Sequence, residues 1–157
     1  MKITALADSV GKGLFAGFAG TLAITASQTV EMKIRARAPS DSPAEAAGIV
    51  LGVQPRGEEE KKRFSQIVHF GYGTAWGAVR GVLRAAGVPP LAATALHFVA
   101  ISGAAMLMLP ALKVAPPVSE WGAESIAIES FHHLVYALAA GAAYDKLERG
   151  ERDEERR

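Results

Sequence analysis

The chain has 157 residues, enough for one domain, and half of them are apolar. It contains 16 glycines and no cysteine, which excludes disulfide bonds and thiolate metal sites. Its formal net charge is +1, so no overall positive field favours a nucleic-acid partner.

Charged residues are distributed very unevenly along the chain. Residues 13–30 and 85–112 carry no charge, whereas most charges lie in residues 31–63 and from Asp145 onward. A soluble helical protein would interleave charged side chains along each helix at the helical period. Uncharged runs of about 18 residues or more are typical of membrane spans. We therefore predict an all-α integral membrane protein; the alternative is a soluble bundle rich in alanine and glycine.

Four membrane-spanning helices are predicted, and together they form a single membrane domain, a four-helix bundle. The prolines at 89 and 90 suit the first turn of the third span, where an N–H has no intrahelical partner. Trp121 lies near the entry to the fourth span, where an interfacial aromatic residue is expected. The expected boundaries are about 10–34, 65–86, 90–110 and 120–147, followed by a charged helical tail over 148–157.

The long loop between the first two spans contains a further short helix. Residues 42–45, Ser-Pro-Ala-Glu, have the pattern of a capping box with proline at the first helical position, and the apolar stretch AEAAGIVLGV continues from there. This helix is expected either as an interfacial helix on the membrane surface over one end of the bundle, or as an ordinary loop helix.

Small residues at four-residue spacing predict which helix faces pack together. In lipid, helices associate through close contact of small residues, because apolar side chains gain nothing by leaving one apolar phase for another. Gly73, Gly77 and Gly81 form such a row in the second span, and His69 lies one step before them. His69 is therefore expected to point into the bundle.

Comparable rows in the first and fourth spans lead to further polar residues. Alternate spans run in opposite directions, so the end of the first span and the beginnings of the second and fourth lie on the side of the long loop. At about 1.5 Å per helical residue, the polar side chains at these ends reach one common depth. We therefore predict a polar cluster beneath that loop. Its members are Gln28, Glu31, His69, Glu129, His132 and His133.

Glutamate and histidine together suit borderline divalent ions such as zinc or iron, and they also suit proton relay. Glu129 and His132 stand at i, i+3, a spacing found in carboxylate-bridged metal bundles. Haem or another small ligand is an alternative occupant. Two simpler interpretations are that the histidines hydrogen-bond between helices, or that some of these residues are hydrated at headgroup level. The candidate metal ligands are Glu31, His69, Glu129, His132 and His133.

Three more polar residues lie inside the predicted spans. His97, near the middle of the third span, is a candidate axial ligand or partner of a buried carboxylate, but an interhelical hydrogen bond is the simpler interpretation. Arg80 and Arg84 lie one turn apart near the far end of the second span. They are expected to extend to the interface, or alternatively to bind an anionic lipid or ligand.

Several short motifs occur in an order that resembles a known family. They are Pro39-Ser40, Pro43-Ala44, His69 to Gly73, Leu109-Pro110, and His132 to Tyr136. In this order the chain is similar, over most of residues 10–147, to the YagU-like family of small bacterial inner-membrane proteins, a domain family of unknown function. The resemblance implies a four-helix protein of the bacterial inner membrane. It implies no reaction and no catalytic residues.

The expected function is that of a non-enzymatic, multi-pass membrane protein. Its buried site would bind a metal ion, haem, a small ligand or protons. Two alternatives remain open: a structural or accessory subunit that docks onto partners through small-residue helix faces, and a metal-dependent membrane enzyme. The expected partners are the lipid bilayer and either a second copy of the chain or a membrane complex.

Overall fold

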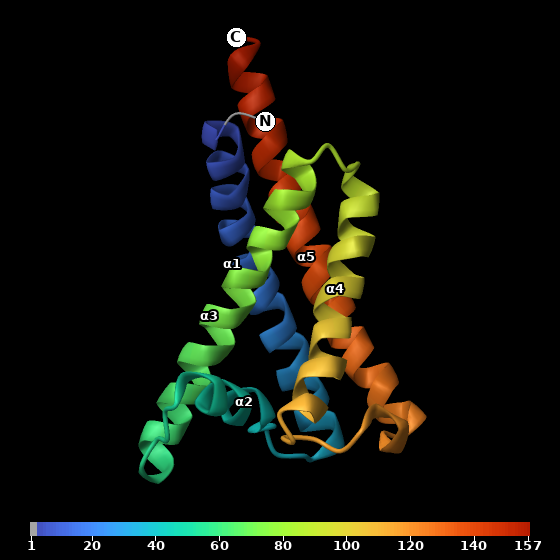
Figure 1. The fold of residues 1–157 in the computed structure, drawn as a ribbon. Coiled ribbons are helices and arrows are strands. Elements are labelled where there is room, and N and C mark those ends of the chain that lie inside the picture. Colours follow the sequence, from blue (N-terminus) through green and yellow to red (C-terminus); the bar gives the residue numbers. More distant parts are fainter. Residues whose placement is uncertain (1–2) are drawn as a thin grey trace.

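A computed structural model describes residues 3–157, and within them the protein is all-helical without β-strands (Figure 1). The all-helical class predicted from the sequence is confirmed. The helix over residues 57–85 begins well before the expected start of the second span, because the charged stretch before it is helical too. The elements are α1 (Ile3–Arg35), α2 (Ser42–Leu51), α3 (Gly57–Ala85), α4 (Pro90–Ala111), a 3₁₀ turn (Val118–Glu120) and α5 (Ala123–Glu155).

The four long helices run roughly along one direction, and the short α2 crosses between them (Figure 1). α1 packs between α3 and α5, while α4 packs mainly on α5. α3 and α4 lie close together where residues 86–89 connect them, and they diverge toward their other ends. α2 lies between these diverging ends and contacts both helices.

Glycine backbones form the contact between α1 and α3. A Cβ added to Gly77 would lie 2.6 Å from the Cα of Gly17, so the two helices meet backbone to backbone. Gly81 lies against Ser9, and Gly73 lies against Thr21. The two rows therefore run antiparallel at four-residue spacing, and the next step brings Thr25 to His69.

Tyr136 of α5 occupies the other face of α1. A Cβ on Gly20 would lie 2.8 Å from the Tyr136 ring, so glycine at this position makes room for the tyrosine. The Tyr136 hydroxyl donates a hydrogen bond to the carbonyl oxygen of Gly73 at 2.5 Å. This single side chain therefore ties α5 to α3 beside α1.

The short helix over 42–51 is present, but the expected capping box is not formed. Its N-cap residue is Asp41, one residue earlier than predicted, and the Asp41 side chain makes no capping hydrogen bond. A proline does occupy the first turn, as the sequence indicates. At the other end Gly52 adopts a left-handed conformation with φ 66°, which glycine tolerates without strain, and its N–H donates to the Gly48 carbonyl oxygen.

Two of the described helices are long and apolar enough to cross a membrane. They are Pro90–Ala111, which is α4, and Ala123–Glu154, which covers almost all of α5. By itself this criterion is also met by the core helix of a soluble protein, so it supports association with a membrane without establishing four spans.

Replacing Gly77 with alanine should destabilise the protein by about 1–3 kcal/mol, because the new methyl group would clash with the backbone of α1. Gly71→Ala on the same helix is the matched control, since a Cβ there meets nothing within 4 Å. Circular-dichroism melts of the two variants, purified side by side, measure the difference. Equal melting temperatures would show that α1 and α3 do not pack through their glycines.

Candidate functional site

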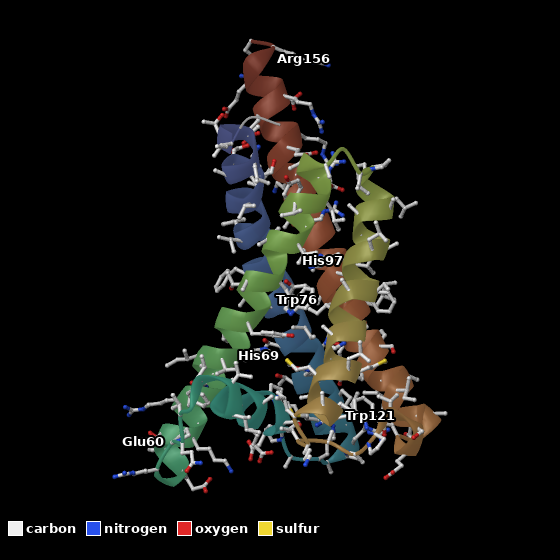
Figure 2. The ribbon with its side chains drawn as sticks, in the orientation of Figure 1. Glu60, His69, Trp76, His97, Trp121 and Arg156 are labelled. Atoms are coloured by element: carbon white, nitrogen blue, oxygen red, sulfur yellow. The ribbon has the colours of Figure 1, made fainter. Side chains whose placement is uncertain are left out.

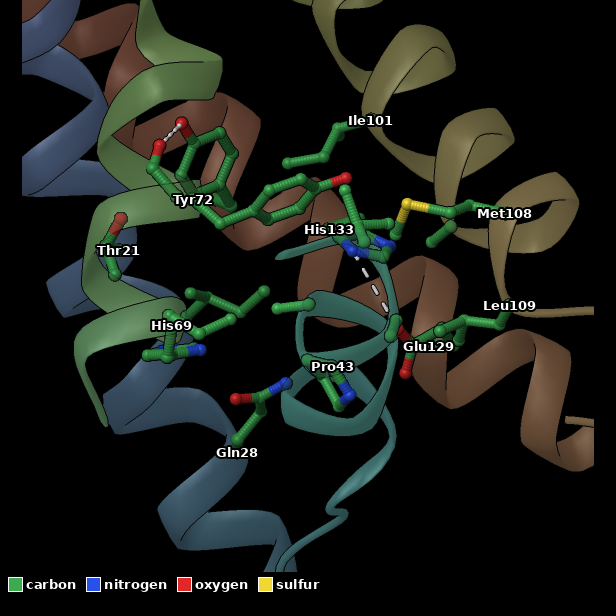
Figure 3. Close-up of a pocket in the computed structure, with 18 of the residues that line it drawn as sticks. Thr21, Gln28, Pro43, His69, Tyr72, Ile101, Met108, Leu109, Glu129 and His133 are labelled. Atoms are coloured by element: carbon green, nitrogen blue, oxygen red, sulfur yellow. Dashed lines mark hydrogen bonds and ion pairs between the residues drawn. The ribbon is translucent and has the colours of Figure 1, made fainter. Parts of the chain in front are cut away.

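A cavity of about 370 Å³ lies where α3 and α4 diverge, and α2 forms one of its walls (Figure 3). All five α-helices contribute side chains to it. Most of its lining is apolar, and the amide, imidazole and carboxyl groups lie toward the end nearest the long loop. The lining residues are Thr21, Ile24 and Gln28 of α1; Pro43, Ala46, Ala47, Val50 and Leu51 of α2; Val68, His69, Tyr72 and Gly73 of α3; Ile101, Ala105, Met108 and Leu109 of α4; and Glu129, His133 and Tyr136 of α5.

Four of the residues predicted to share a site line this one cavity. Gln28, His69, Glu129 and His133 come from three different helices, and Figure 3 shows them around the same space. Their convergence follows from the alternating direction of the helices, which brings the end of α1 and the early turns of α3 and α5 to one level.

The His69 ring is held by α1. The hydroxyl of Thr25 donates to the Thr21 carbonyl oxygen at 2.6 Å, so it accepts the hydrogen bond that it shares with His69 Nε2 at 2.8 Å. Nε2 of His69 therefore carries the proton. This bond fixes the position of the ring at the wall of the cavity and uses one of its two nitrogens.

Glu129 and His133 form the polar group on α5. Their side chains lie one helical turn apart, with His133 Nε2 3.7 Å from Glu129 Oε1, as the dashed line in Figure 3 marks. His133 is 8% exposed, and its Nδ1 is buried with no hydrogen-bond partner among the residues described. The pair thus combines a partly exposed carboxylate with an imidazole that has hydrogen-bonding capacity left over.

Glu31 and His132 lie outside this cavity, in the interface between α1 and α5. His132 Nδ1 is hydrogen-bonded to the Ser27 hydroxyl at 2.8 Å, and its Nε2 is 3.9 Å from Glu31 Oε2. Glu31 itself is paired with Arg35 at 3.2 Å and Arg37 at 2.5 Å. The hydrogen bond to Glu31 raises the pKa of Arg37, so this guanidinium keeps its charge and neutralises the carboxylate.

The five candidate metal ligands are therefore divided between two neighbouring places. Within residues 3–157, no three histidine or carboxylate side chains lie close enough together to hold a metal ion. The Glu129–His133 pair supplies two donors at the cavity, and His69 is turned to Thr25. Metal or haem binding by this set stays a prediction.

His97 makes an interhelical hydrogen bond, the simpler of the interpretations considered for it. Its Nε2 donates to the Trp76 carbonyl oxygen at 3.0 Å, and its ring lies edge-on to Tyr136 with centroids 5.5 Å apart. Figure 2 shows His97 and Trp76 next to each other, farther along the bundle than His69. His97 is fully buried and does not line the cavity.

An ion pair at the opposite end of the bundle was missed by the sequence analysis. The expectation that Arg80 extends to the interface is wrong, because its side chain is 0% exposed. Arg80 donates to Asp145 at 2.6 Å, to the Pro90 carbonyl oxygen at 2.9 Å and to the Thr94 hydroxyl at 2.8 Å, and it lies over the Tyr144 ring.

Arg84 pairs with Glu148 at 2.7 Å in the same way. The sequence contains a pattern that could have predicted both the Arg80–Asp145 and the Arg84–Glu148 pairs. Two cations at i, i+4 on the second span face two anions at i, i+3 on the fourth, at the same end of the bundle. Asp145 lies in the last turn of the predicted fourth span and Glu148 at the start of the predicted charged tail, and no partner was expected for either.

No protein-family model, no curated protein and no solved structure matches this chain. The resemblance to the YagU-like family stays a prediction.

Arg80→Met should destabilise the protein by about 3 kcal/mol or more, because it removes the charge partner of Asp145 and the bonds to α4. Arg63→Met is the matched control, since Arg63 and Glu59 form an exposed pair at 3.6 Å. Thermal melts should show a large loss for the first variant and almost none for the second. Similar melting temperatures for the two would mean that the Arg80 pair does not hold the helices together.

Proposed function

We propose that this protein is a four-span integral membrane protein of the bacterial inner membrane, and that its cavity binds a small amphipathic molecule. The observation that carries the binding proposal is the cavity itself: five helices enclose a mostly apolar space with a group of polar side chains at one end.

The distribution of side chains supports the membrane part of this proposal. The largest fully buried side chains include the polar groups of Arg80, His97, His132 and Thr21, while many large apolar side chains on all four long helices are exposed. A protein folded in water buries its apolar side chains and exposes its polar ones. A surface that is apolar along the helices, around a polar interior, is stable when lipid surrounds it.

Exposure of the two most apolar helices supports the same conclusion. Only 22% of the most apolar window of α4 and 33% of that of α5 is buried. The core helix of a soluble protein would be mostly buried. These helices instead present most of their apolar surface outward, as a membrane-spanning helix does.

α1 and α3 complete the proposed set of four spans. Residues 13–30 of α1 carry no charge. α3 is less apolar, but its glycines lie against α1 and its buried arginine is paired. Intramembrane charges are tolerated when they face the interior and have partners. α2 exposes Ile49, Val50 and Leu51, which suits an interfacial helix.

A small amphipathic molecule fits the cavity in size and in chemistry. Its volume of about 370 Å³ lies within the range of ligand pockets, about 300–1,000 Å³. Side chains of α4, among them Ile101 and Leu109, form an apolar wall, and Gln28, His69 and Glu129 offer hydrogen-bonding groups at one end. Such a site holds the apolar body of a ligand and orients its polar head.

Membrane integration predicts how the protein fractionates. Washing membranes that contain it with alkaline carbonate should leave the protein in the pellet, because its exposed apolar helices stay in lipid. Immunoblotting of the pellet and supernatant measures this. Recovery of a monomer in the supernatant without detergent would refute the membrane proposal.

Filling the cavity should abolish binding of a small amphipathic probe. Ala105→Phe on α4 places a ring inside the cavity, and Ala95→Phe on the same helix replaces an exposed alanine as the control. Binding of 1-adamantanol, a compact apolar cage with one hydroxyl, is measured by ligand-observed NMR on the purified protein. We expect binding to the wild type and to Ala95→Phe but not to Ala105→Phe. Equal signals from the two variants would place the probe outside the cavity.

A further inference from the structure

Glu129 is the one acidic side chain lining the cavity among the residues described. The remaining polar groups of the lining are an amide, hydroxyls and imidazoles. Its side chain is 38% exposed and therefore accessible from the space around it. The cavity thus has an acidic end in otherwise apolar surroundings.

Other carboxylates within the bundle have arginine partners. Asp145 is paired with Arg80, and Glu148 with Arg84. Glu31, at about the same depth as Glu129, is held by Arg35 and Arg37. Each of these three carboxylates is therefore neutralised by at least one arginine.

Glu129 has no arginine within 4.0 Å among the described side chains, and Arg37, which pairs with Glu31, acts on it only from farther away. Among the described side chains, the only basic group within 4.0 Å of its oxygens is His133 Nε2, at 3.7 Å. A neutral imidazole does not cancel the charge, and an unpaired carboxylate next to apolar side chains is energetically unfavourable. A positively charged group supplied by a ligand would remove this cost.

The rest of the lining also suits a cation with an apolar body. Tyr72, Tyr136 and Met108 line the same cavity, and Figure 3 shows two of them around it with Glu129. Aromatic faces attract ammonium groups, and a thioether is polarisable and adapts to varied shapes. An anionic ligand would be repelled by Glu129, whereas a neutral one would leave the carboxylate unpaired.

We propose that the ligand is an amphipathic organic amine, whose protonated nitrogen binds Glu129 and whose apolar body fills the space between α3 and α4. This inference rests on the proposed function, since it names the class of molecule that the same cavity takes. A primary ammonium can donate one hydrogen bond to Glu129 and others to Gln28 or His133.

Three probes with one apolar body separate the contribution of charge from that of shape. They are 1-adamantylamine, 1-adamantanol and 1-adamantanecarboxylate, titrated at pH 7 into the wild-type protein in one detergent. We expect the amine to bind about tenfold or more tighter than the alcohol, because a hydrogen bond to a charged group is stronger than one between neutral groups. The carboxylate should bind more weakly than the alcohol.

Two variants test whether Glu129 causes the preference for the amine over the alcohol. Glu129→Gln should remove the advantage of the amine over the alcohol, while Glu124→Gln, an exposed position on the same helix that pairs with Arg35, should keep it. Alcohol and amine binding equally well to the wild type would overturn the amine proposal and leave the cavity proposal intact. Equal losses in the two variants would also overturn it, because surface charge would then explain the preference. Failure of all three probes to bind the wild type would refute the cavity proposal itself.

Discussion

The backbone contact between α1 and α3 determines the geometry of the rest of the protein. Because Gly17 and Gly77 allow the two helices to touch, α1 and α3 form one closely packed antiparallel pair, and Thr25 meets His69 at the end of this contact. The opposite face of α1 is then available for α5. A larger residue in this contact would separate the helices and move His69 away from the cavity.

α3 and α4 are held together at one end and diverge at the other. Arg80 binds Asp145 of α5 and two oxygens at the start of α4, so α3, α4 and α5 converge there. Without a comparable connection at their other ends, α3 and α4 diverge, and α2 occupies part of the gap (Figure 1). The cavity therefore lies at the end of α3 and α4 that is far from the Arg80 and Arg84 ion pairs. Its polar end is on the side of the long loop.

Glycine spacing predicted the packing of α3 and the direction of His69, because close backbone contact requires a glycine at every fourth position. Counting residues from the helix ends correctly predicted that Glu129 and His133 lie at the level of His69. Depth alone did not predict direction around the helix axis. His132 and His133 point about 100° apart, so one faces α1 and the other faces the cavity. The Arg80–Asp145 bond was not predicted because Asp145 begins the charged C-terminal stretch, which suggested a solvated residue. In the structure Asp145 still lies against Arg80.

The wall formed by α2 bears on how a ligand reaches the cavity. Val50 and Leu51 line the cavity and are also largely exposed, so α2 is a single layer between the cavity and the exterior. The side chain of its N-cap residue Asp41 makes no capping hydrogen bond, and the helix ends at Gly52. It is attached on both sides by segments without helical structure. Under the proposed function, an amphipathic molecule dissolved in the bilayer would meet the apolar side chains of this wall. On the same proposal, such a molecule would pass this single layer of side chains to reach Glu129, whose own side chain is 38% exposed.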